Sequence, residues 1–123
     1  MNIKTIELLG EQHPLCFSMT AAQNLTERFG SLEAMGDQLM NDDVTVRREA
    51  INDALTELLR AGRVYAKAKG DALPREITCK VADILPPNTA TPVALIVSVM
   101  SADAKREVEV EGGRKNAEAT LSQ

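Results

Sequence analysis

The chain has 123 residues, a length that suits one domain with a single hydrophobic core. Only 2% of the residues are aromatic, so the core must consist mostly of Leu, Ile, Val, Met and Ala, which favours helices over a β-sandwich. The shortage of aromatic residues also argues against a stacking platform for single-stranded nucleic acid. The net charge of −4 means that the molecule as a whole does not attract polyanions.

The small number of cysteines and the short apolar runs indicate in which cell compartment the protein resides. Cys16 and Cys79 are too few for a disulfide framework, and no signal peptide precedes them. The longest apolar run, Val93–Met100, is too short to span a bilayer. We therefore expect a soluble intracellular protein in a reducing cytoplasm, with both thiols reduced.

Two short strands are predicted first, over 3–9 and 13–17, joined by a turn at Gly10-Glu11-Gln12. His13, Leu15 and Phe17 alternate onto one face, and Pro14, which has no N–H for a ladder, indicates a strand with a free edge. Two strands are marginally stable alone, so we expect the hairpin to lie on the helices.

Two short helices should follow the hairpin. The first is predicted over 19–29, with Thr20 and Gln23 as a capping box and Gly30 as its stop. Its apolar residues at helical spacing are Met19, Ala22, Leu25 and Phe29. The second is predicted over 32–40, with Ser31 as its cap. Its inner side is expected to hold Leu32, Met35, Leu39 and Met40.

The third predicted helix is the longest and begins after Asp42 or Asp43, either of which is a suitable cap. Its wide apolar stripe consists of Val44, Ile51, Ala54, Leu55, Leu58 and Leu59. Gly62 either ends this helix or lies in its interior, and the pattern fades by Gly70. Residues 71–74 then read as a loop.

A fourth, shorter helix is predicted over 78–85, with Thr78 as its cap and Val81, Ile84 and Leu85 inward. Pro86-Pro87 must end it. A fifth is predicted from Thr91-Pro92 to about Ala104, although the run over 93–100 fits a buried strand nearly as well. From Lys105 onward the mixed charge and Gly-Gly pair predict a flexible tail, with the alternation of REVEVE as a competing strand interpretation.

These elements together predict a mainly α fold, with about five helices and an N-terminal β-hairpin, which is α+β by a strict count. We expect a single helical domain over 1–104 and a flexible C-terminal tail over 105–123.

Metal and catalytic motifs are weak in this sequence. His13 and Cys16 have H-x-x-C spacing and Cys79 is a conceivable third ligand, but a structural zinc site needs four ligands and no fourth stands out. A nucleophilic cysteine needs a neighbouring base, and His13 is the only histidine. We therefore predict no catalytic residue, no metal and no cofactor, and a protein that is not an enzyme.

A modest basic face lies near the end of the third predicted helix. Arg60, Arg63 and Lys67 fall at i, i+3 and i+7, and the three helices around Phe29-Gly30-Ser31 are compatible with a helix-turn-helix. A DNA-binding regulator is therefore the alternative function, although basic residues late in a helix also complement the helix dipole and lie in solvent.

The apolar residues of the fifth helix are a second candidate binding surface. Val93, Ile96, Val97 and Met100 fit one helical face. Most such stripes are core, yet this one follows a proline-rich linker, and a detachable apolar helix is a common way to dock on a partner. Both interpretations stay open at this stage.

Several segments, taken in order, resemble the tail assembly chaperones of long-tailed bacteriophages and prophages. The similarity covers roughly residues 3–85 and lies in the succession of segments rather than in any one of them. The segments are Gly10–Phe17, Met19–Ala22 through Arg28-Phe29-Gly30-Ser31, Leu58-Leu59-Arg60-Ala61-Gly62, and Thr78–Leu85. Arg63, where relatives often have an apolar residue, and the longer basic loop over 64–75 depart from the pattern.

The resemblance implies a binding protein without an active site. Such chaperones bind the aggregation-prone tape measure protein, help to recruit major tail protein subunits, tend to self-associate, act in the host cell cytoplasm and are absent from the finished virion. A longer product made by programmed ribosomal frameshifting often adds a domain for the tail-tube subunit, and Arg114-Lys115-Asn116 fits an A-rich slippery codon run.

Overall fold

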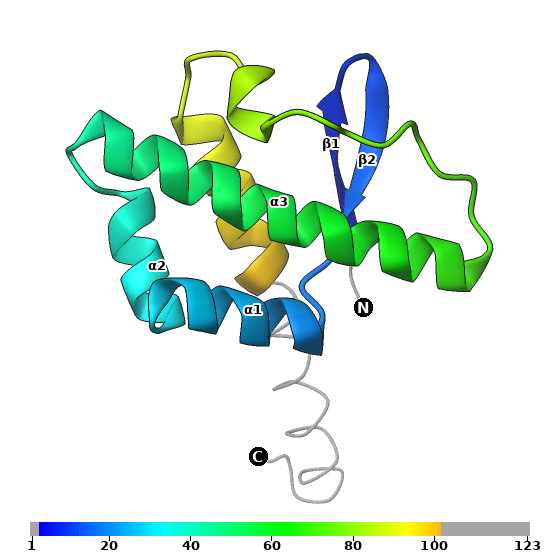
Figure 1. Cartoon of the computed structure of the whole chain (residues 1–123), viewed down its shortest axis with the longest axis horizontal. Helices are drawn as coiled ribbons and strands as arrows, with labels where there is room; N and C mark the ends of the chain where they lie inside the picture. The colour runs from blue at the N-terminus through cyan, green and yellow to red at the C-terminus, as the bar shows by residue number, and fades with distance from the viewer. Residues whose placement is uncertain (1–2, 102–123) are drawn as a thin grey trace, which may run out of the picture.

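The computed structural model describes residues 3–101, which form a two-stranded hairpin and four helices. The elements are β1 (Lys4–Leu8), β2 (Glu11–Leu15), α1 (Met19–Phe29), α2 (Leu32–Leu39), α3 (Val44–Lys69), the short 3₁₀ turn η1 (Val81–Asp83) and a helix over 90–101. Figure 1 shows α3 crossing the molecule, with α1 and α2 along one side and the hairpin on the other. The prediction of a mainly α fold with a small β part is confirmed, but the helices number four rather than about five.

The hairpin turn lies one position earlier than predicted. Leu9 and Gly10 both have positive φ, 53° and 81°, as a two-residue type I′ turn requires, so Glu11 belongs to β2 and pairs with Leu8. Pro14 pairs with Thr5. Counting from the turn, this is a non-hydrogen-bonded pair, so the ladder loses nothing from the missing N–H of Pro14.

The second strand packs directly on the backbone of α3. Gly62 lies in the interior of that helix, and a Cβ there would overlap the carbonyl of Pro14, so only glycine permits this approach. Just beyond the strand, the Cys16 N–H donates to the Leu58 carbonyl at 3.1 Å. Of the two alternatives for Gly62, the interior position is the one observed, and α3 ends instead at Gly70 in the left-handed conformation.

Side-chain caps set the start of the first three helices. Ser18, not Thr20, caps α1, because its Oγ accepts from the Ala21 N–H at 3.1 Å. The Ser31 hydroxyl caps α2, as predicted, by accepting from Ala34 N–H at 2.9 Å. Asp43 caps α3 by accepting from Thr45 N–H at 2.8 Å. Gly30 ends α1 at a φ of 91°, which confirms its predicted role.

The core lies where α3 meets the hairpin, α1, α2 and the 90–101 helix. Its buried members include Leu8, Leu15, Leu25, Phe29, Met35, Leu39, Ile51, Leu55, Leu58, Ile96 and Val99. Several residues predicted to face inward lie outside it: Met19 is 90% exposed, Met40 72%, Val44 60% and Leu32 36%. Each sits at the first residue or cap of its helix, where fewer neighbouring turns are available to cover it.

The predicted helix over 78–85 was wrong. Residues 71–80 have no regular secondary structure, and only three residues, Val81–Asp83, form a 3₁₀ turn. Lys80 rather than Thr78 precedes this turn, and it makes no side-chain capping bond. Val81 is buried, while Ile84 and Leu85 are half-buried, so the apolar residues were rightly expected to face inward.

The run over 93–100 is helical, which settles the choice between helix and strand. The helix begins at residue 90, earlier than the predicted cap at Thr91, and the Val93 N–H donates to the Thr89 carbonyl at 3.2 Å. The predicted end at 104 and the tail over 105–123 lie outside the described residues.

Candidate functional site

A ten-residue segment, 71–80, turns back at the end of α3, runs beside this helix past the hairpin and forms one wall of a pocket (Figure 1). Hereafter it is called the strap. Arg63 Nη1 of α3 donates to the Pro74 carbonyl at 2.8 Å, and the Arg75 N–H donates to Glu11 Oε1 of β2 at 3.1 Å. Most of the strap is exposed and only Pro74 and Ile77 are half-buried, so few contacts hold it in place.

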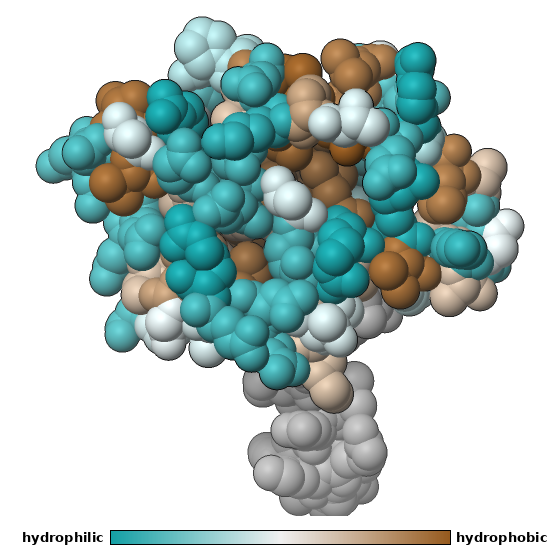
Figure 2. Space-filling model, viewed as in Figure 1, coloured by the Kyte–Doolittle hydropathy of each residue, from teal (hydrophilic) through white to brown (hydrophobic). Residues whose placement is uncertain are grey.

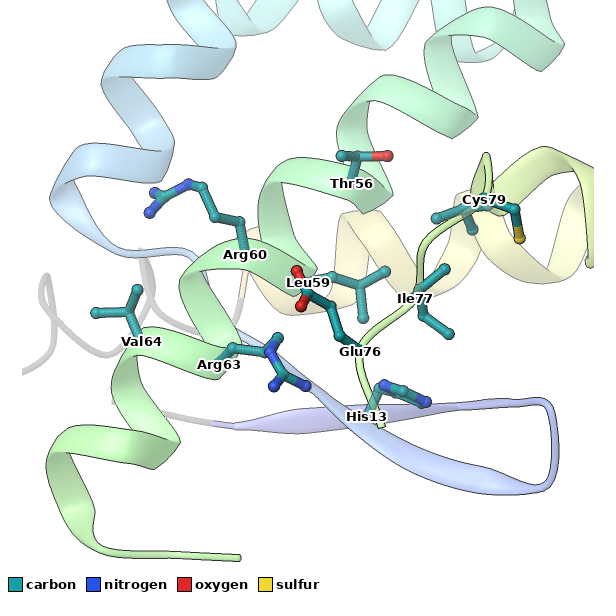
Figure 3. Close-up of a pocket in the computed structure, with 10 residues that line it drawn as sticks. His13, Thr56, Leu59, Arg60, Arg63, Val64, Glu76, Ile77 and Cys79 are labelled. Carbon is teal, nitrogen blue, oxygen red and sulfur yellow. The ribbon is translucent and has the colours of Figure 1, made fainter. Parts of the chain in front are cut away.

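The strap pocket, between the strap, α3 and β2, has a volume of about 320 Å³. Its lining residues are His13, Thr56, Leu59, Arg60, Arg63, Val64, Glu76, Ile77, Cys79 and Val81. Figure 2 shows a recess at this position, with apolar atoms deep inside and polar residues around its rim. In Figure 3 the Glu76 side chain points from the strap toward α3. The pocket therefore has an apolar floor and a rim of mixed charge.

The tertiary structure brings His13 and Cys79 to the same pocket, but not into a catalytic arrangement. His13 is 2% exposed, and its Nε2 is buried without a hydrogen-bond partner among the described residues. Figure 3 shows the Cys79 sulfur on the strap pointing away from α3, and Ile77 of the strap lies between Cys79 and His13 of β2. No hydrogen bond joins the thiol to the imidazole. This arrangement offers no activated nucleophile.

The sequence-level metal hypothesis gains no support from the geometry. Cys16 follows β2 and is buried in a small cluster with Ala21 and Ala61, and it does not line the strap pocket. Within residues 3–101, no group of three or more His, Cys, Asp and Glu side chains is placed to hold a metal ion.

The predicted basic face is largely engaged within the chain. Arg60 Nη2 lies 2.6 Å from Glu57 Oε2, and these hydrogen bonds raise the pKa of Arg60 against the opposing effect of burial. Arg63 holds the strap, and Lys67 is exposed. Glu57 therefore compensates Arg60, while Asp53, two turns earlier on α3, pairs with Arg28 of α1 at 2.7 Å. A compensated surface of this kind attracts a phosphate backbone weakly.

The four residues predicted on one face of the 90–101 helix divide between core and surface. Val93 and Ile96 are buried, Met100 is half-buried, and Val97 is 50% exposed. The buried position after Ile96 is Val99, not Val97, so the core-facing stripe is rotated from the predicted one. In this fold Val93 and Ile96 pack on the chain's own core, and docking through them requires the helix to leave it.

A second apolar surface lies between the first half of α3 and the segment over 82–92. A pocket of about 210 Å³, hereafter the corner pocket, is lined by Val44, Arg48, Ile51, Ala82, Leu85, Pro86, Pro87, Asn88, Thr89 and Pro92. Val44 is 60% exposed, and Met40, which caps the end of α2 four residues earlier, is 72% exposed. The only charged lining residue is Arg48. This surface can accept an apolar side chain with a carboxylate nearby.

Sequence reasoning missed the residues that shape both pockets. Glu76 and Ile77 were assigned to no functional surface, and Pro86-Pro87 was read only as a helix stop. Gly62 carried a usable signal, because Gly62 and Ala66 are small residues one turn apart on the apolar side of α3, a spacing that permits close backbone approach.

Comparison with models of protein families, with curated proteins and with solved structures finds no match to this chain. Among the described residues, none of the helices combines the length and apolar character needed to cross a membrane.

Proposed function

We propose that this chain is a tail assembly chaperone of a long-tailed bacteriophage or prophage, a binding protein that holds the tape measure protein while the tail is built. The resemblance over residues 3–85 is the basis of the family assignment. The observation that best supports the binding role is the corner pocket, a largely apolar pocket with the 60% exposed Val44 in its wall.

The chemistry of this surface suits a helical partner. An amphipathic helix binds by inserting apolar side chains spaced three and four residues apart into a groove. A tape measure protein is long and helical, so it repeatedly presents such anchors. Arg48 at the rim can pair with an acidic residue one turn from the anchor.

The remaining parts of the proposal follow from the family. The chain would act in the host cell cytoplasm, self-associate, and be absent from the mature virion. Major tail protein would be recruited through a longer form made by programmed frameshifting, and the DNA sequence around Arg114-Lys115-Asn116 tests this directly. A gene without a slippery heptamer near its 3′ end would exclude the frameshifted form.

The binding role is tested by co-expressing the chain with the tape measure protein encoded in the same gene cluster. We expect the tape measure protein to become soluble and to co-purify with this chain. If it stays in the insoluble fraction at all expression ratios, the proposal fails.

A matched pair of variants tests the corner pocket. Val44→Glu puts a charge on the pocket wall, whereas Thr45→Glu makes the same change at the next exposed residue, which does not line the pocket. Both changes place a carboxylate in the first turn of α3, where the helix dipole tolerates it. We expect Val44→Glu to lose the tape measure protein and Thr45→Glu to retain it.

A further inference from the structure

The outer edge of β1 pairs with no further strand among residues 3–101, whose sheet has two strands. On the other side of the hairpin, α3 covers β2 through the Pro14–Gly62 approach and the Cys16–Leu58 hydrogen bond. A two-residue turn closes on a hydrogen-bonded pair, here Leu8 with Glu11, and bonded and non-bonded pairs then alternate.

This alternation gives the direction of the backbone groups of β1. Thr5 and Glu7 belong to the non-bonded pairs, so their N–H and C=O groups point away from β2. Within residues 3–101 no hydrogen bond reaches these outward groups. Such an edge is a template for a further strand.

Two apolar features accompany this edge. A cavity of about 230 Å³ lies beside it, lined by Ile6, Glu7, Leu85, Pro86, Asn88, Thr91, Pro92 and Leu95. Leu9, at the hairpin tip, is 61% exposed at a φ of 53°, a left-handed conformation that asparagine or glycine adopts more easily than leucine. An exposed leucine held in a disfavoured conformation is a feature that a contact with another chain would explain.

We propose that a second copy of this chain pairs with this edge, β1 against β1 in antiparallel orientation, so that two hairpins form one four-stranded sheet across a two-fold axis. This inference names the surface for the self-association that the proposed function includes. It is argued from the β1 edge, so the pairing can fail while binding of the tape measure protein stands.

Self-complementarity favours the second copy as the occupant. In such a pairing Thr5 and Glu7, whose backbone groups point outward, must lie opposite Thr5 or Glu7 of the second copy. Three registers satisfy this condition. Glu7 opposite Glu7 brings like charges together, and Thr5 opposite Thr5 leaves Leu8 beyond the paired strand. Thr5 opposite Glu7 of the second copy pairs all five residues of both strands, forms four backbone hydrogen bonds at its two Thr–Glu pairs, and places no like charges directly opposite each other.

The same register covers the apolar groups. Ile6 meets Ile6 of the second copy on the axis, next to the cavity that Ile6 lines. Leu9 comes beside Ile3 of the second copy at each end of the paired strands. An isologous contact of this kind closes at two copies, because each edge is used once.

The experiment is sedimentation velocity of the full chain over a range of concentrations, with two variants of one exposed side chain. Thr5→Glu places a carboxylate opposite Glu7 of the second copy at both pairs, and Thr5→Lys places an ammonium there. We expect a dimer whose dissociation constant rises on the order of tenfold in Thr5→Glu and falls by several-fold in Thr5→Lys. Circular dichroism checks that both variants keep the helical fold.

Leu9→Asn separates folding from association. Asparagine suits the left-handed turn position, so the melting temperature of the dilute monomer should rise while the dimer weakens. A chain that stays monomeric at every concentration overturns the proposal, as does a dimer whose dissociation constant is the same in Thr5→Glu and Thr5→Lys.

Discussion

Gly62 of α3 and Pro14 of β2 meet backbone to backbone. A Cβ at position 62 would overlap the carbonyl oxygen of Pro14. It would also lie 2.5 Å from the Pro14 carbonyl carbon and 3.0 Å from the Leu15 backbone nitrogen. Because the obstructing atoms are main chain, no rotamer change can make room. This contact sets how closely the hairpin lies on α3, and with it the position of His13 in the strap pocket.

Gly62→Ala should therefore lower the free energy of unfolding by about 3 kcal/mol, despite the better helix propensity of alanine. Gly36→Ala in α2 is the matched control, since a Cβ there meets nothing within 4 Å and its φ is not positive. The control should be stabilised by roughly 0.5–1 kcal/mol in urea unfolding. Equal effects of the two substitutions would contradict the close approach.

The cap of α1 gives a second prediction. Ser18→Ala removes the acceptor for the Ala21 N–H and should lower the free energy of unfolding by about 1 kcal/mol. Thr20→Ala lies in the first turn, where no capping bond is made, and should change it by less than about 0.3 kcal/mol. Thermal denaturation of the two variants distinguishes them, and a larger loss in Thr20→Ala would restore the capping box that the sequence suggested.

Two buried polar side chains should respond in opposite ways to replacement by leucine. His13 Nε2 has no partner among the described residues, so His13→Leu should leave the free energy of unfolding unchanged or raise it by about 1 kcal/mol. Asn52 Oδ1 accepts from the Ala82 N–H at 3.0 Å, so Asn52→Leu should lower it by about 2 kcal/mol. A loss in His13→Leu as large as in Asn52→Leu would mean that the imidazole makes a stabilising bond.

The strap should open when its anchor on α3 is removed. Arg63→Met deletes the hydrogen bond to the Pro74 carbonyl, and the exposed Arg75 next to it is a trypsin site. We expect cleavage after Arg75 on the order of fivefold faster, because proteolysis follows the population of the open form. Mass spectrometry of early digests measures this rate. Lys67→Met, an exposed change on the same helix, should leave the rate unaltered.

The sequence was sufficient for structure that depends on neighbours within about four residues. The stop at Gly30, the cap at Ser31 and the mainly α class were predicted, because capping bonds and helical periodicity are local. For the longest helix the sequence left open an end at Gly62 or a pattern that fades by Gly70, and the structure ends it at Gly70. The same locality explains the small errors, such as Ser18 rather than Thr20 as a cap, since both hydroxyl residues lie at the start of the helix and each can accept from the N–H three residues later.

What the tertiary structure decided is the set of contacts between distant segments. Local pattern could not show that Gly62 touches Pro14, that residues 71–80 form a strap instead of leading into a helix, or that Val99 replaces Val97 in the core. Each depends on which surface another element presents, and the sequence encodes that only through the packing of the whole chain. The pockets share this origin, because their walls come from segments that meet only after folding.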